Sequence, residues 1–126
     1  MRSLPWSFPL LLLLLFACGG LREDLSRAER CYDDARYQDA LTWLRTLEKE
    51  APRMDRPARA RYYYLRGMAS YRLGRRDDAL HYLALAREEL SDGQGLEERQ
   101  RQQMDRALEE LTPQDASFRA RKADDE

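Results

Sequence analysis

Cysteine and histidine are scarce in this chain. Its 126 residues include two cysteines, Cys18 and Cys31, and one histidine, His81. Cys18 ends an apolar run near the amino terminus, so Cys31 is left as a lone thiol and no disulfide framework is available. We expect Cys31 to be a small buried residue between helices. A single histidine offers no paired metal ligands, so we expect no metal and no other cofactor.

Catalytic motifs are absent from the sequence as well. There is no glycine-rich phosphate loop, no Cys-x-x-Cys motif, and no Ser or Cys nucleophile with a plausible histidine base. We therefore expect that the chain is not an enzyme. Charged residues make up 36% of the chain but nearly cancel, with a formal net charge of −1. Nucleic-acid binding needs an excess of Lys and Arg along one face, so we expect no nucleic-acid partner.

The sequence also lacks an apolar run long enough to span a bilayer. The unbroken run extends only from Leu10 to Ala17, whereas a transmembrane helix needs about 20 apolar residues. Arg2 precedes the run, and the small residues Gly19 and Gly20 follow shortly after it. This layout is typical of a secretory signal peptide.

The end of this run carries a second signal, in Leu15, Ala17 and Cys18. These residues resemble the lipobox of bacterial lipoproteins. The resemblance implies a signal peptide at 1–17, a lipidated anchor and short linker at 18–21, and several acyl chains on Cys18, which is what stable membrane attachment requires. Because Gly19 rather than Asp follows the cysteine, it also implies the outer membrane, facing the periplasm. Two alternatives remain: cleavage elsewhere with Cys18 incidental, and an uncleaved amino-terminal anchor.

The rest of the chain is rich in segments whose apolar residues recur at helical spacing. Glycine and proline lie at the joints between these segments. Three stripes stand out: Ala40, Leu41, Leu44 and Leu47; Ala79, Leu80, Leu83, Ala86 and Leu90; and Leu96, Met104, Ala107, Leu108 and Leu111. The third predicts a last amphipathic helix from about Leu96 to Leu111. We expect a helical domain at 22–111, with this helix as its cap, and a charged, disordered tail at 112–126.

The first two stripes are copies at an offset of 39 residues, the separation of Ala40 and Ala79. Chance pairing over the compared segments would give roughly one or two identities. The identical pairs are Arg27 and Arg66, Tyr32 and Tyr71, Arg36 and Arg75, Asp39 and Asp78, Ala40 and Ala79, Leu41 and Leu80, Leu44 and Leu83, and Glu50 and Glu89. Small residues are paired as well: Ala28 with Gly67, Cys31 with Ser70, and Ala35 with Gly74.

This arrangement of small residues resembles the tetratricopeptide repeat (TPR). The resemblance implies an all-α fold of antiparallel helix pairs, a TPR-like α-solenoid of about five helices. The offset exceeds the family's usual period of about 34 residues, and the extra residues fit the joint from Pro52 to Pro57. Two repeats are marginal for independent stability, since about three are usually needed. A homodimer, or docking on a larger partner, would relieve that shortage.

The same resemblance implies a concave groove that binds peptides or partner helices. Helical spacing places several of the candidate residues on one stripe of the third helix, and aromatic and Arg side chains suit a binding surface. The candidate partner-binding residues are Tyr32, Arg61, Tyr64, Met68, Tyr71 and Arg72. The alternative is that the tyrosines belong to the core between the helices.

The sequence thus predicts a membrane-anchored adaptor in a bacterial envelope assembly. The lipid on Cys18 would attach it to the membrane, and the shallow groove would bind a protein or peptide of the cell envelope. The alternative is a chaperone-like envelope lipoprotein that binds extended or unfolded chains without a fixed partner. Both functions need the same groove, so composition does not separate them.

Overall fold

The computed structural model describes residues 8–90 and 94–112, with side chains from Gly20 onward. The described residues form five α-helices and one short 3-10 helix, and none of them forms a strand. The elements are α1 (Phe8–Asp33), α2 (Tyr37–Thr46), η1 (Ala51–Arg53), α3 (Arg56–Arg72), α4 (Arg76–Glu89) and α5 (Glu98–Leu111). The prediction of an all-α fold with about five helices is confirmed.

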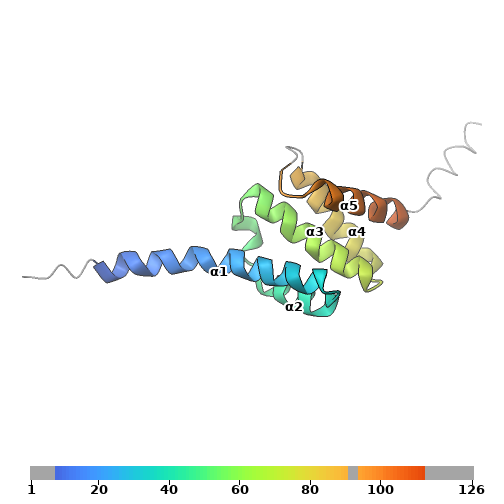
Figure 1. Ribbon diagram of the computed structural model, residues 1–126. Helices are drawn as coiled ribbons and strands as arrows, with labels where there is room; N and C mark the ends of the chain where they lie inside the picture. The colour runs from blue at the N-terminus through green and yellow to red at the C-terminus, as the bar shows by residue number, and fades with distance from the viewer. Residues whose placement is uncertain (1–7, 91–93, 113–126) are drawn as a thin grey trace, which may run out of the picture.

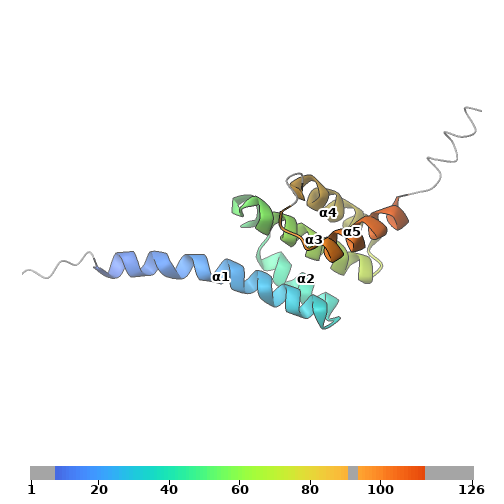
Figure 2. The same ribbon diagram turned by 45° about the horizontal axis from the view of Figure 1, so that its top comes forward.

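The helices pack as consecutive pairs. α2 folds back along the carboxyl-terminal half of α1, α4 folds back along α3, and α5 lies against the second pair (Figures 1 and 2). The amino-terminal half of α1 projects away from the packed helices (Figure 1). None of the helices, as far as the structure describes them, is both long and apolar enough to cross a membrane.

The two helix pairs turn in the same way. After α1, the N–H of Ala35 donates to the Tyr32 carbonyl and the N–H of Arg36 to the Cys31 carbonyl, at 2.9 and 2.8 Å. After α3, the same bonds join Gly74 to Tyr71 and Arg75 to Ser70, at 3.1 and 2.9 Å. Each partner is displaced by the offset of 39 residues found in the sequence. Ala35 and Gly74 both adopt a positive φ, 59° and 73°.

The core combines most of the three predicted stripes with the buried faces of α1 and α3, and Leu80 and Leu90 of the second stripe are only partly buried. In α2 and just after it, Ala40, Leu41, Leu44 and Leu47 are all buried. Leu96 and the apolar face of α5 are buried too, although α5 begins at Glu98 rather than at Leu96. The later start follows from a capping box, in which the side chains of Glu97 and Gln100 bond each other's backbone N–H. Cys31 is buried as expected.

Small residues allow the paired helices to approach closely. Ala28 is fully buried in α1. A Cβ on its counterpart Gly67 would lie 2.6 Å from Cδ2 of Leu83 and 2.9 Å from the Leu83 backbone nitrogen. The crossing of α3 and α4 therefore leaves no room for a larger residue at this position.

Several sequence assignments fall outside the described residues. These are residues 1–7 of the expected signal peptide and residues 113–126 of the expected tail. Cys18 is placed by its backbone alone, inside α1. α1 itself begins at Phe8, so one continuous helix connects the expected anchor to the packed domain.

Candidate partner-binding groove

A groove of about 220 Å³ lies where α1, α3 and α5 come together. We call it the Tyr32 groove. It is lined by Tyr32 and Asp33 of α1, Tyr37 of α2, Tyr64 and Arg72 of α3, and Arg99, Gln100 and Gln103 of α5. Three of the six candidate residues from the sequence, Tyr32, Tyr64 and Arg72, therefore meet at one site.

Aromatic rings form one wall of the Tyr32 groove. The Tyr32 ring packs edge-on against Tyr64, with ring centroids 6.5 Å apart, and is tilted against Tyr37 at 5.4 Å. Tyr64 is 1% exposed, and its hydroxyl donates to Oε1 of Gln103 at 3.0 Å. Tyr64 thus belongs to the core and offers the groove little more than its hydroxyl, whereas Tyr32 is half-buried.

Polar and charged groups form the rest of the groove. Burial raises the pKa of Tyr32 above its ordinary value of 10.0. The Arg72 guanidinium lies near the Tyr32 hydroxyl and lowers its pKa, against the effect of burial. Partial desolvation raises the pKa of Asp33, and the nearby carboxylates of Glu29 and Asp34 raise it further. The groove therefore combines aromatic surface with guanidinium, hydroxyl, carboxylate and amide groups, the chemistry of a peptide-binding surface.

The remaining candidate residues lie elsewhere. Met68 is 1% exposed, so its side chain meets other core residues rather than solvent. Tyr71 is half-buried, and its hydroxyl donates to the Glu110 carboxylate on α5. Arg61 pairs with Glu29 of α1. The partner-binding role of these three residues stays a prediction, and Tyr32 and Arg72 are the candidates with side-chain surface inside the groove.

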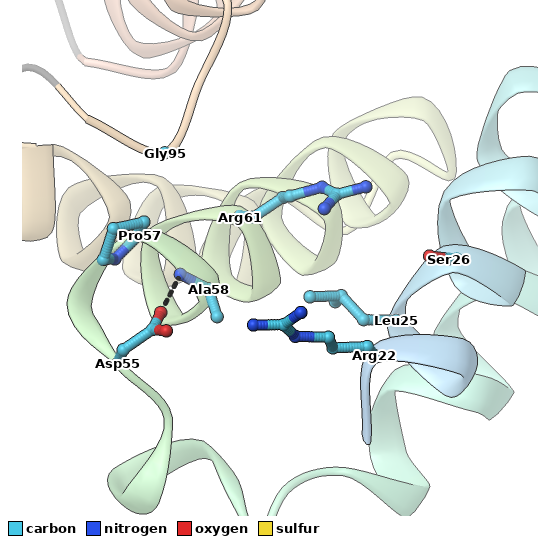
Figure 3. A pocket seen from close by; sticks show the side chains of 8 residues that line it. All are labelled: Arg22, Leu25, Ser26, Asp55, Pro57, Ala58, Arg61 and Gly95. Atoms are coloured by element: carbon cyan, nitrogen blue, oxygen red, sulfur yellow. Dashed lines mark hydrogen bonds between the residues drawn. The ribbon is translucent and has the colours of Figure 1, made fainter. Parts of the chain in front are cut away.

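Arg61 lines a second and larger cleft, which we call the Arg22 cleft (Figure 3). It has a volume of about 390 Å³ and lies between α1, the start of α3 and the segment before α5. Its lining consists of Arg22, Leu25, Ser26, Asp55, Pro57, Ala58, Arg61 and Gly95. The Arg22 cleft contacts α1 at Arg22 to Ser26, whereas the Tyr32 groove contacts it at Tyr32 and Asp33. The two sites therefore lie at different levels along α1.

Sequence reasoning missed the contribution of α5 to the Tyr32 groove. Gln103 and Glu110 follow Tyr64 and Tyr71 by 39 residues, the repeat offset. Extending the offset once more along the chain would have placed α5 beside α3. The repeat is hard to recognise in the sequence of α5, because α5 has no small residues at the positions equivalent to Gly67 and Ser70.

His81 and the acidic pair Asp77 and Asp78 lie near the start of α4. His81 is exposed, and its ring lies 4.9 Å from that of Tyr82. Within the part of the chain that the structure describes, no group of three His, Cys, Asp or Glu side chains is arranged to hold a metal ion. Asp77 and Asp78 lie in the first turn of α4, where carboxylates favour the helix dipole.

Comparisons with known proteins give no match to a family model, to a curated protein or to a solved structure.

Proposed function

We propose that this chain is a membrane-anchored adaptor of a bacterial envelope assembly, which binds a protein partner in the Tyr32 groove. The observation that carries the proposal is the groove itself, in which side chains of α1, α3 and α5 meet. A surface built by three helices and containing half-buried aromatic and exposed Arg side chains suits a partner peptide or helix. We further propose that the two helix pairs are TPR repeats, supported by their matching turns at an offset of 39 residues.

The anchor is the second part of the proposal. Leu15, Ala17 and Cys18 resemble a lipobox, and α1 runs without a break from Cys18 into the packed domain. A lipid on Cys18 would hold the domain close to the membrane surface, and Tyr32 would then stand about 21 Å above the anchor at the rise of an α-helix. We propose the outer membrane, facing the periplasm, as the location.

Labelling with a radioactive fatty acid tests the anchor. Wild-type chain should take up label and fractionate with one membrane, and Cys18→Ala should lose both properties. Unlabelled wild type would refute the lipid anchor and leave the groove to be tested alone.

Crosslinking in the producing cells tests the groove. Tyr32→Ala and Arg72→Ala should both lose the same crosslinked partner, while Arg45→Gln, an exposed change on α2 outside the groove, should retain it. Circular dichroism should confirm that the variants stay helical. If folded Tyr32→Ala and Arg72→Ala keep the partner, the groove is not the binding site. If many unrelated extended chains crosslink instead of one, the chaperone-like function replaces the adaptor.

A further inference from the structure

The Arg22 cleft contains charges that the proposed adaptor function does not use. Arg22 and Arg61 bring guanidinium groups to it and Asp55 brings a carboxylate, while Leu25, Pro57 and Ala58 give it an apolar wall. Figure 3 shows the Arg22 side chain reaching from α1 toward Asp55 and Ala58 at the start of α3. A cleft of about 390 Å³ lies within the usual range of small-ligand sites, about 300–1,000 Å³.

These charged groups have bonding capacity left over. Arg22 makes no hydrogen bond or ion pair with any residue that the structure describes. Oδ1 of Asp55 accepts from the Ala58 N–H at 2.9 Å, which leaves Oδ2 for another donor. Arg61 directs Nε and Nη2 to Glu29, which leaves Nη1. The cleft therefore presents free N–H donors on Arg22 of α1 and Arg61 of α3, and a free carboxylate oxygen on Asp55 at the start of α3.

The position of the cleft relates it to the membrane. α1 is continuous between Cys18 and Arg22, so the two residues are about 6 Å apart along the helix axis. The headgroup layer of a bilayer is roughly 5–7 Å thick on each side. If Cys18 is held at the membrane, Arg22 and the mouth of the cleft lie at the level of the phospholipid headgroups.

We propose that the Arg22 cleft binds a phospholipid headgroup that carries both a phosphate and a primary ammonium group, a phosphoethanolamine. Arg22 and Nη1 of Arg61 would bind the phosphate, and Oδ2 of Asp55 would accept from the ammonium. Leu25, Pro57 and Ala58 would face the apolar side of the lipid. This inference rests on the proposed anchor at Cys18, and it adds a second attachment that fixes the orientation of the domain, with the Tyr32 groove directed away from the membrane.

Modification of arginines in the full-length lipidated chain tests the proposal. The chain is reconstituted in vesicles of phosphatidylcholine alone, or with phosphatidylethanolamine or phosphatidylglycerol added, and floated. The floated protein is treated with phenylglyoxal, and modification of each arginine is followed by mass spectrometry. Phosphatidylethanolamine should slow the modification of Arg22 and Arg61 about fivefold relative to phosphatidylcholine. Arg45, exposed on α2 outside the cleft, should react at the same rate in both.

Two variants separate specific binding from general attraction to a charged surface. Asp55→Asn keeps a good helix cap but loses the negative charge, so it should abolish the difference between phosphatidylethanolamine and phosphatidylcholine. Arg22→Gln should expose Arg61 to modification, since both arginines are expected to share one headgroup. Arg45→Gln should change neither result.

The opposite results would overturn the proposal. Equal rates in phosphatidylethanolamine and phosphatidylcholine would do so, as would equal slowing of Arg45. Stronger protection by phosphatidylglycerol, unaffected by Asp55→Asn, would indicate attraction to anionic lipid instead. If soluble phosphoethanolamine, added to the protein in phosphatidylcholine vesicles, protects Arg22 and Arg61 as well as phosphatidylethanolamine does, the ligand is not the lipid. A chain that floats without protection refutes only this inference, whereas a chain that does not float refutes the anchor and this inference together.

Discussion

Ala35 and Gly74 occupy the same place in the two helix turns, and both adopt a positive φ. This conformation costs an L-residue with a Cβ roughly 1–2 kcal/mol, and it costs glycine almost nothing. The first turn therefore contains backbone strain that the second avoids. A Cβ added at Gly74 would meet no atom within 4 Å, so the difference between the two turns lies in the backbone alone.

We predict that Ala35→Gly stabilises the protein by about 1 kcal/mol and that Gly74→Ala destabilises it by about the same amount. Urea denaturation followed by circular dichroism measures both changes. Gly20→Ala is the matched control: Gly20 is helical, and a Cβ there meets nothing within 4 Å, so this change should stabilise α1. A loss of stability in Ala35→Gly would show that strain is not what distinguishes the two turns.

Arg27 and Arg66 are a second pair of equivalent residues with matching surroundings. The Arg27 guanidinium lies 5.1 Å from the ring centroid of Trp43, and that of Arg66 lies 4.3 Å from the centroid of Tyr82. Trp43 and Tyr82 are themselves separated by the repeat offset. A cation–π contact thus recurs at the equivalent position of both helix pairs.

At the scale of elements, the α3–α4 crossing depends on Gly67. We predict that Gly67→Ala destabilises the fold by about 1–3 kcal/mol, because the new methyl group would overlap Leu83. Leu83→Ala alone should cost about 2–5 kcal/mol through the cavity that it leaves. The double variant should cost less than the sum of the two, since the cavity accommodates part of the methyl group. Full additivity in urea denaturation would contradict this packing.

The ion pair between Arg59 of α3 and Glu89 of α4 predicts a dependence of stability on pH. Arg59 bonds Glu89 twice, at 2.8 and 3.1 Å, and these bonds lower the pKa of Glu89 from its ordinary value of 4.5. A lowered pKa in the folded state contributes stability above pH 4.5, and this contribution is lost as the pH falls through the folded value. Part of the decline in stability below pH 4.5 should therefore come from Glu89.

Measuring the free energy of unfolding as a function of pH tests that contribution. Glu89→Gln should lower stability at pH 7 and flatten the decline below pH 4.5. Glu109→Gln on α5 is the control, because Glu109 is exposed and makes no contact of this kind with a described residue. Equal profiles for wild type and Glu89→Gln would mean that the ion pair contributes nothing.

The helices and much of the core could be predicted from the sequence, because the buried face of a helix requires apolar residues at three- and four-residue spacing. Leu44 and Leu83 are both fully buried, as their stripes predicted. The surroundings of the tyrosines could not be predicted in this way. Tyr64 and Tyr71 lie on the same stripe of α3, yet Tyr64 is 1% exposed and Tyr71 is half-buried. That difference depends on how α1 and α5 are angled against α3, and no spacing within α3 encodes it.

At the scale of the whole molecule, α5 closes one end of the helix array. Arg76 donates to the Leu111 carbonyl at 2.6 Å, and Arg87 pairs with Asp105 at 2.9 Å. Together with the contacts of Tyr64 and Tyr71, these bonds connect α5 to both helices of the second pair. Its apolar face is buried, and its other face is charged, as a terminal cap requires.

At the other end of the helix array, α1 lacks the residues with which α3 packs against the preceding helix pair. In α3, Tyr62 is 1% exposed, and Arg66 meets Glu48, just after α2, at 3.5 Å. The equivalent residues of α1 are Glu23 and Arg27, which pair with each other at 2.7 Å and remain well exposed to solvent. A second copy stacked on this edge would have to bury that ion pair and would gain no equivalent of Tyr62. The edge therefore disfavours the homodimer that two short repeats suggested.

We predict that the full-length chain is a monomer in the membrane. Two differently tagged copies, expressed together and extracted in mild detergent, should not co-purify, and crosslinking before extraction should yield no dimer. Burying Glu23 and Arg27 in a dimer interface would remove both charges from water, and the attraction between them would not make up for this desolvation cost. Glu23→Gln with Arg27→Gln removes that cost, so any dimer formed by this variant and not by wild type would identify the pair as the barrier. Co-purification of wild-type copies would contradict the prediction. It would also indicate that a second copy, rather than a larger partner, provides the stability that two repeats alone are expected to lack.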